Sequence, residues 1–212
     1  MKSAPLAIVA ATALAAGAAA GAWIYRSRAP EPAAPATALP PLALAASLPE
    51  VSLLDREGMP RGFDHWRGRS LIVNFWATWC APCRREIPLL ERLQVENAGD
   101  GFQVVGVAVD YRDKVLAYAD EMDISYPLLI GEQEALDAAA AFGVDIVGLP
   151  FTVFSDAQGR IIAAHIGELT AAEAGVILAA VRRVNSGGAT PLQARADIER
   201  GLRAPPPAAA EG

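Results

Sequence analysis

The sequence predicts an α/β fold in which helices flank a mixed central sheet. Between about residues 48 and 184, short apolar runs alternate with segments of helical periodicity. Two consecutive apolar runs near the end of this region are joined by a glycine-containing turn, which is typical of an antiparallel hairpin. A helix-start signal follows the hairpin. Elements in this order pack as one sheet covered by helices.

The first half of this region contains two strands with a helix between them. Residues 70–76 and 102–109 are nearly continuous apolar runs, which indicates strands buried on both faces. A helix is predicted over 81–96, with Pro82 in its first turn, where proline is tolerated. Pro88 lies inside the same helical pattern and predicts a kink.

Four further elements are predicted in chain order: helices over 113–121 and 132–142, and hairpin strands over 151–154 and 161–166. Gly159 occupies the hairpin turn, where a positive φ is needed. Thr170 and Glu173 have the spacing of a capping box, so a helix is expected to begin there.

Two segments before this region differ from it in composition. Residues 4–25 contain no charged side chain, and a helix of this length would be about 33 Å long, enough to cross a bilayer core. Residues 1–28 are therefore predicted to be an N-terminal transmembrane helix. A cleaved signal peptide is the alternative, because Ala18-Ala-Ala20 resembles a small-residue cleavage site. Residues 29–47 are rich in proline and alanine, which predicts an extended linker.

The segment after residue 184 has a different character again. Asn185-Ser-Gly-Gly188 is expected to end the preceding helix. Residues 190–202 fit a short polar helix with Pro191 in its first turn, whereas Pro205-Pro-Pro207 is typical of disorder. We expect residues 185–212 to be a flexible C-terminal tail.

Composition excludes several functions. The net charge of −6 argues against a nucleic-acid partner, because binding phosphates requires a basic face. Two cysteines in 212 residues are too few for a disulfide-knit scaffold or a four-thiolate zinc module. The only histidines, His65 and His165, have no local spacing to the cysteines that would complete a zinc site. We expect no metal and no cofactor.

The two cysteines form a Cys-x-x-Cys motif, Cys80 and Cys83, that follows a strand and opens a helix. Free N–H groups and the helix dipole stabilise a thiolate at a helix N-terminus, which makes Cys80 the expected nucleophile. Cys83 follows one turn later on the same helix face, so it can displace a mixed disulfide. Redox chemistry is therefore the favoured interpretation of the motif.

The segment Val73-Asn-Phe-Trp-Ala-Thr-Trp-Cys-Ala-Pro-Cys-Arg-Arg-Glu-Ile-Pro88 and the later Gly148-Leu-Pro-Phe-Thr152 point to a known family. Over about residues 48–184 the chain closely resembles the membrane-tethered thiol:disulfide oxidoreductases of the TlpA/ResA type, in the thioredoxin superfamily. The resemblance implies a thioredoxin-like fold over 48–184 and a redox-active disulfide between Cys80 and Cys83.

The resemblance also implies a substrate-binding surface around the cysteines. Pro150 is expected to follow a cis peptide bond after Leu149 and to dock the substrate backbone. Trp79 and Pro82 flank the thiols and are expected to contact the substrate, although a packing role for Trp79 is an open alternative.

A third catalytic residue is expected at Glu86, which matches the glutamate that handles protons in this family. Asn74 stands where soluble thioredoxins have a buried aspartate, and an amide cannot exchange protons, so proton transfer is expected to depend on Glu86. The alternative is that Glu86 only favours the helix N-terminus electrostatically.

The direction of electron flow is predicted from Ala81-Pro82, which lacks the histidine that stabilises the thiolate of strong oxidants. Reduction of client disulfides is therefore expected. The resemblance implies that the domain faces the periplasm from the bacterial inner membrane. Its expected partners are disulfide-containing clients, with apocytochrome c and copper-site proteins as candidates, and a membrane electron donor of the DsbD/CcdA type.

Three other functions are alternatives. A copper chaperone would bind Cu(I) through the two cysteines and His165. A dedicated cytochrome c maturation reductase commonly has a glutamate after the cis-proline, where this chain has Phe151. A peroxidase is disfavoured, because Thr78 is two residues before Cys80 and that chemistry requires a hydroxyl three residues before it.

Overall fold

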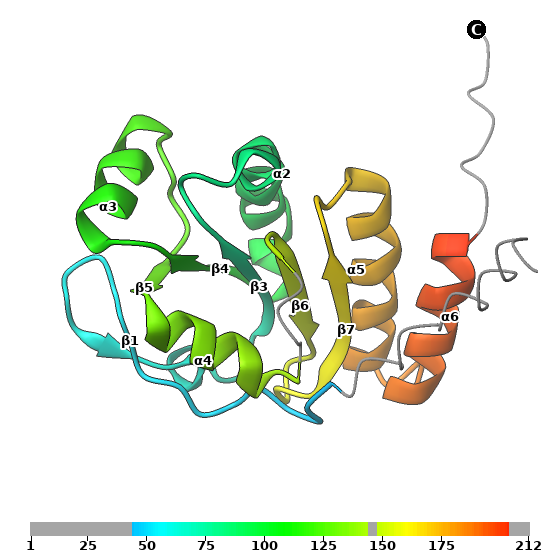
Figure 1. Cartoon of the computed structure of the whole chain (residues 1–212). Coiled ribbons are helices and arrows are strands. Elements are labelled where there is room, and N and C mark those ends of the chain that lie inside the picture. Colours follow the sequence, from blue (N-terminus) through cyan, green and yellow to red (C-terminus); the bar gives the residue numbers. More distant parts are fainter. Residues whose placement is uncertain (1–43, 144–147, 204–212) are drawn as a thin grey trace, which may run out of the picture. The chain divides into compact units, whose positions relative to one another are not determined.

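The computed structural model describes residues 44–143 and 148–203 (Figure 1). The predicted membrane helix, all but the last residues of the predicted linker, and residues 204–212 lie outside the described residues. Within the described ranges, no helix combines the length and the apolar character needed to span a bilayer.

The elements in chain order are β1 (Leu53–Leu54), β2 (Pro60–Arg61), η1 (Phe63–Trp66), β3 (Ser70–Trp76), α2 (Ala81–Asn97), η2 (Ala98–Asp100), β4 (Phe102–Val109), α3 (Arg112–Glu121), β5 (Leu128–Gly131), α4 (Gln133–Ala141), β6 (Phe151–Ser155), β7 (Ile161–Ile166), α5 (Ala171–Asn185) and α6 (Pro191–Arg203). The strands form one sheet in the order β2-β1-β5-β4-β3-β6-β7. The pairs β3–β4 and β4–β5 are parallel and the other pairs are antiparallel. The predicted mixed α/β sheet is confirmed.

Strand β3 organises both layers of the core. All seven of its residues are buried, and alternate side chains point to opposite faces of the sheet. Ile72 and Trp76 pack with residues of α2, α3, α5 and α6, whereas Val73 and Phe75 pack with η1 and α4. In Figure 1, α4 accordingly lies on the face of the sheet opposite α2 and α5. A strand covered on both faces explains why the run lacks polar alternation.

The sequence predicted the long elements well and the short ones poorly. β3 and β4 have the predicted bounds, and the capping box at Thr170 forms, with its hydroxyl accepting from the Glu173 N–H at 3.3 Å. β1, β2 and β5 were not predicted. They contain two, two and four residues, which is too few to show a periodicity.

The short helix predicted over residues 190–202 is confirmed as α6, so the expected flexible tail over 185–212 is wrong for residues 191–203. Thr190 and Gln193 make a second capping box, with the Thr190 N–H donating to Gln193 Oε1 at 2.8 Å and the Gln193 N–H donating to Thr190 Oγ1 at 3.3 Å. Ala194 and Ile198, four residues apart, bury their side chains in the core. The folded domain therefore extends to Arg203.

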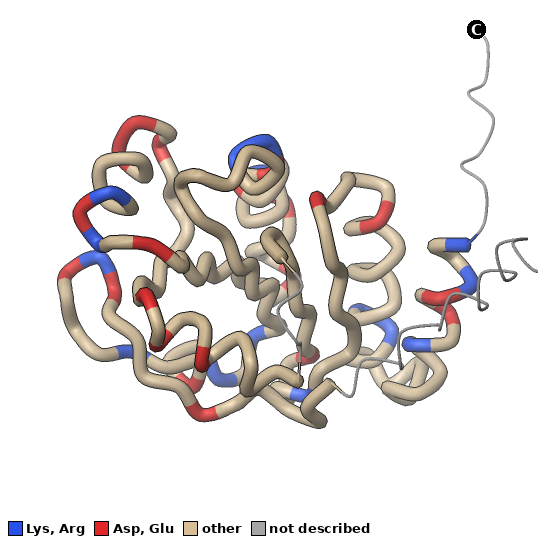
Figure 2. The backbone as a smooth tube through the Cα atoms, in the orientation of Figure 1, with Lys and Arg blue, Asp and Glu red and all other residues tan. Residues whose placement is uncertain are grey.

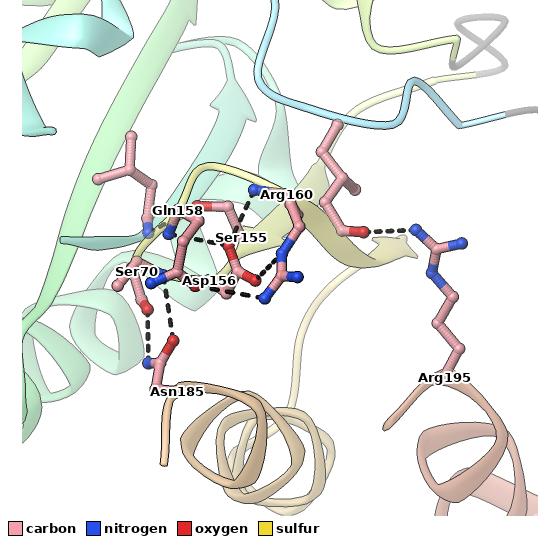
Figure 3. A network of polar contacts seen from close by, with 10 residues as sticks. Ser70, Ser155, Asp156, Gln158, Arg160, Asn185 and Arg195 are labelled. Carbon is pink, nitrogen blue, oxygen red and sulfur yellow. Dashed lines mark hydrogen bonds and ion pairs between the residues drawn. The ribbon is translucent and has the colours of Figure 1, made fainter. Parts of the chain in front are cut away.

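A polar network holds the β6–β7 turn in place at the end of the sheet remote from the cysteines (Figure 3). Asn185, at the end of α5, donates to Ser70 Oγ at 2.9 Å and accepts from the Ala157 N–H at 3.1 Å. Asp156 is fully buried and accepts from Arg160 Nε at 2.6 Å. These contacts join β3, the turn and α5 into one framework.

Candidate active site

The two cysteines lie where β3 passes into α2. Cys80 is the N-cap residue of α2, and its Sγ accepts from the Cys83 N–H at 3.3 Å. The two sulfur atoms form a disulfide with an S–S distance of 2.00 Å. Cys80 retains 5% exposure and Cys83 has none. A client can therefore reach Cys80 first, at a position where the helix N-terminus stabilises a thiolate.

The turn before Cys80 is held by Asp110, a residue not predicted from the sequence. Its carboxylate is 7% exposed and accepts from the Thr78 N–H at 3.3 Å and from the Thr78 hydroxyl at 2.5 Å. Asp110 directly follows β4, and parallel strands β3 and β4 end at the same edge of the sheet. A polar residue at this position of a parallel strand was the available signal. The Thr78 hydroxyl donates to this carboxylate.

Glu86 is buried inside the helix face that carries Cys83. It is 1% exposed, and the i to i+3 spacing places it on the same side of α2 as Cys83. Its Oε1 accepts from Asn74 Nδ2 at 2.7 Å and its Oε2 accepts from the Leu169 N–H at 2.9 Å. Burial raises the pKa of Glu86 to about 7, although both hydrogen bonds act in the opposite direction.

Asn74 links Glu86 to the neighbouring strand. Asn74 on β3 is paired in register with Thr152 on β6, and its Nδ2 donates to Thr152 Oγ1 at 3.0 Å. Both side chains are completely buried. The structure thus places the asparagine that replaces the thioredoxin aspartate directly on the carboxylate of Glu86. Neither Thr152 nor the Leu169 N–H was identified from the sequence, because neither residue type signals a role.

The Leu149–Pro150 peptide bond is cis, as the family resemblance implied. Pro150 is buried and directly precedes β6. The first residue of β6, Phe151, is in register with Phe75 near the end of β3, and the two rings stack with centroids 4.3 Å apart. This pairing places the cis-proline at the edge of the sheet where β3 leads to the cysteines.

An aromatic surface lies beside the cysteines. Trp79 is 68% exposed and Tyr111 is 53% exposed. Both line a groove of about 370 Å³ together with Asp110 and Leu136. The exposure of Trp79 favours substrate contact over the packing alternative, because a packing tryptophan would be mostly covered. Pro82 is half-buried in the first turn of α2.

The first turn of α2 is basic, and the turn between β7 and α5 facing it is acidic, as the blue and red segments of Figure 2 show. Arg85 donates to Glu168 Oε2 from Nε at 2.9 Å and from Nη2 at 2.5 Å. Arg84, its neighbour, makes no ion pair with any described residue.

The copper-chaperone alternative requires Cys80, Cys83 and His165 to lie together, and the described residues do not show such a group. In the described ranges, no three His, Cys, Asp or Glu side chains are grouped to hold a metal ion. His165 Nε2 instead lies 3.4 Å from the Glu168 carbonyl oxygen and 3.9 Å from Glu173 Oε2.

The chain is similar to known proteins. Residues 44–164, more than half of the chain, match the AhpC/TSA family. The thioredoxin-like protein YneN of Bacillus subtilis is 35% identical over 129 residues, which make up 59% of this chain and 72% of YneN. The thiol-disulfide oxidoreductase ResA of Geobacillus thermodenitrificans is 29% identical over 130 residues, which make up 61% of this chain and 72% of ResA.

A solved structure shows the same fold. The thiol:disulfide interchange protein of the thioredoxin family from Chlorobium tepidum TLS superposes with a TM-score of 0.53 at 27% sequence identity. The match covers 76% of this chain and 98% of that protein. The fold, the disulfide at the start of α2 and these similarities all indicate the same family. The chain belongs to the AhpC/TSA family and is a TlpA/ResA-like thiol-disulfide oxidoreductase of the thioredoxin superfamily.

Proposed function

We propose that this protein reduces disulfides in extracytoplasmic client proteins, with Cys80 as the attacking thiol and Cys83 as the resolving thiol. The observation that supports these roles is the asymmetry of the site. Cys80 caps α2 and keeps some exposure, whereas Cys83 is fully buried beside the buried carboxyl of Glu86 on the next helical turn.

In the first step the reduced protein forms a mixed disulfide. The Cys80 thiolate attacks one sulfur of the client disulfide, so that a Cys80–client bond forms and the client S–S bond breaks. The departing client sulfur leaves as a thiolate and takes up a proton. The α2 N-terminus lowers the free energy of the Cys80 thiolate and so favours it both as nucleophile and as leaving group.

In the second step Cys83 releases the client. Cys83 gives its proton to the Glu86 carboxylate, and the resulting thiolate attacks Cys80 Sγ. The Cys80–Cys83 disulfide forms, and the second client sulfur leaves and is protonated. The client has then gained two electrons and two protons, and the protein is in the oxidised state that the structure contains. A proton acceptor with a pKa of about 7 suits this transfer at neutral pH.

The surface around Cys80 is suited to a protein client. Trp79 offers an exposed aromatic face, and Pro82, Leu149 and Pro150 complete the proposed docking surface. Extended client backbone would lie along the cis-proline segment, next to the sheet edge that leads to Cys80.

The reducing direction requires a partner that returns the protein to the dithiol state. We propose that a membrane protein of the DsbD/CcdA type supplies these two electrons, and that residues 1–28 anchor the domain at the periplasmic side of the inner membrane. The extended linker lets one domain reach both the donor and clients near the membrane surface. Apocytochrome c and copper-site proteins are the candidate clients.

A redox titration tests the proposed direction. Equilibration of the full-length protein with thiol–disulfide buffers should give a reduction potential near that of thioredoxin, about −270 mV, and far from that of DsbA, about −120 mV. The reduced protein should also reduce a disulfide-bonded model protein, and the Cys80→Ser variant should not. A potential near the DsbA value would contradict the proposed direction, whereas exchange activity in Cys80→Ser would contradict the assigned nucleophile.

A further inference from the structure

The turn between β7 and α5, residues 167–170, is attached to α2 at two successive residues. Glu168 accepts two hydrogen bonds from the Arg85 guanidinium, at 2.9 and 2.5 Å. The next residue, Leu169, donates its N–H to Glu86 Oε2 at 2.9 Å. Neighbouring residues of the turn therefore bind neighbouring residues of the helix, and one of those residues is the buried carboxyl.

The two attachments differ in their exposure to solvent. The side chains of Arg85 and Glu168 are 60% and 36% exposed, whereas Glu86 is 1% exposed. The ion pair thus lies outside the Glu86–Leu169 hydrogen bond and holds the turn against the helix. A backbone donor keeps its direction only while the turn that carries it is held in place.

Among the described residues, few other charges act on Glu86. Its side-chain partner on β3, Asn74, is uncharged, and so is Thr152 on β6, to which Asn74 also donates. Before β5, Tyr126 lies close enough to interact with Glu86, and burial raises the pKa of Tyr126, so it stays neutral. Glu168 is the charged residue that raises the pKa of Glu86 electrostatically. On α2 itself, Cys83 carries no charge because it is in the disulfide, and Arg85 forms an ion pair with Glu168.

We propose that Arg85 and Glu168 are a positioning pair, which fixes the Leu169 N–H on Glu86, balances the charge beside it, and so sets the pH range in which Glu86 exchanges its proton. The inference rests on the proposed role of Glu86 in proton transfer. Loss of the arginine charge leaves Glu168 unbalanced and disfavours the Glu86 carboxylate. Loss of the Glu168 charge leaves the Arg85 charge unbalanced and favours the Glu86 carboxylate. The two variants should therefore have opposite effects.

The test measures the Glu86 carboxyl directly. In the oxidised full-length protein labelled with ¹³C at glutamate side chains, the Glu86 signal is identified by its absence in Glu86→Gln and is followed against pH. Arg85→Gln should raise the pKa of Glu86 by roughly half a pH unit, because the charge effect and the loosened Leu169 N–H act in the same direction. Glu168→Gln should lower it by a smaller amount, because there the two effects oppose each other. If the pair only held the turn in place and did not balance charge, both variants would raise the pKa of Glu86. If the pair had no effect on the site, neither variant would change that pKa. Either result overturns the proposal.

Two controls isolate the pair. Arg84→Gln removes a positive charge from the same helical turn without breaking the contact with Glu168, and should shift the Glu86 titration less than Arg85→Gln does. His165 is another ionisable side chain beside the turn, with Nε2 3.4 Å from the Glu168 carbonyl oxygen and 3.9 Å from Glu173 Oε2. The series is therefore repeated with His165→Gln, and opposite shifts should persist. Since the titration uses the oxidised protein without added thiol, no exchange reaction takes place, and failure of these shifts is distinct from failure of Glu86 as a catalytic residue.

Discussion

At the residue scale, Glu86 shows how burial in a fold changes the pKa of a common side chain. Two hydrogen bonds, from Asn74 and Leu169, favour its carboxylate. Burial opposes them and is the larger effect, so the pKa of Glu86 rises to about 7. A residue that would be fully ionised on the surface is therefore poised to take and return a proton at neutral pH.

Replacement of Glu86 by glutamine tests this catalytic role. Glu86→Gln keeps the size of the side chain and removes the ionisation. In the wild type, the rate of the Cys83 attack step should rise with pH around an inflection near 7. In the variant this inflection should vanish and the rate at pH 7 should fall by about 100-fold. Stopped-flow measurement of mixed-disulfide resolution gives the profile. An unchanged profile means that Glu86 acts only on the helix.

The same pKa shift predicts a pH-dependent stability. Because the pKa of Glu86 is about 7 in the folded state and 4.5 as its ordinary value, its contribution is fully present below pH 4.5 and is lost as the pH rises through 7. The free energy of unfolding of the oxidised wild type, relative to Glu86→Gln, should fall by about 3 kcal/mol over this window. Urea unfolding at several pH values measures the difference, and a constant or rising difference would be inconsistent with a buried acid.

The two cysteines should differ in reactivity for the same local reasons. In the reduced protein at neutral pH, iodoacetamide should modify Cys80 roughly 100-fold faster than Cys83, because Cys80 caps the helix and Cys83 is fully buried. Mass spectrometry of quenched time points gives both rates. Equal rates would contradict the assignment of Cys80 as the attacking thiol.

At the element scale, the framework around the site depends on contacts that no local pattern reveals. β3, β4 and the hairpin were predictable because each is a continuous apolar run. β5 was not predicted, because it is short. α6 was predicted as a short polar helix, but its packing was not, because within its polar sequence only Ala194 and Ile198 are buried. The second capping box, at Thr190 and Gln193, was the missed sign of its stability.

A pair of substitutions on α6 tests whether this helix belongs to the folded domain. Ile198 is 5% exposed and Leu192 is 76% exposed. Ile198→Ala should lower the free energy of unfolding by about 2–4 kcal/mol, since it leaves a cavity between α6 and the core. Leu192→Ala, on the same helix, should change it by less than about 0.5 kcal/mol. Equal, small effects would mean that α6 does not contribute to the core.

At the scale of the whole molecule, the sheet brings together residues that are distant in the chain. Asn74, Glu86 and Leu169 come from β3, α2 and the turn before α5. The sequence could predict Cys80, Cys83 and Glu86, because each is a reactive side chain within one motif. It gave only a weak signal for Asp110, a polar residue directly after a strand, and could not predict Thr152 or the Leu169 N–H as parts of the site. Their roles come from strand register and from a backbone donor, which appear only when the strands are paired.

The site is held between two fixed ends of the sheet. At the cysteine end, Asp110 binds the turn that leads to Cys80. At the other end, Asn185 and Ser70 join α5 to β3 (Figure 3). The start of α2 and the end of α5 are therefore both bound to the sheet, and the turn that supplies the Leu169 N–H connects β7 of that sheet to α5.

Trapping of the mixed disulfide tests the central claim most directly. In Cys83→Ser the proposed resolving thiol is absent, so a client with a disulfide should remain bound to Cys80 and be found there by peptide mass spectrometry after an acid quench. In Cys80→Ser, Cys83 is buried and should trap little or no client. A client bound to Cys83 in Cys80→Ser as readily as to Cys80 in Cys83→Ser would contradict the assignment of the attacking and resolving cysteines.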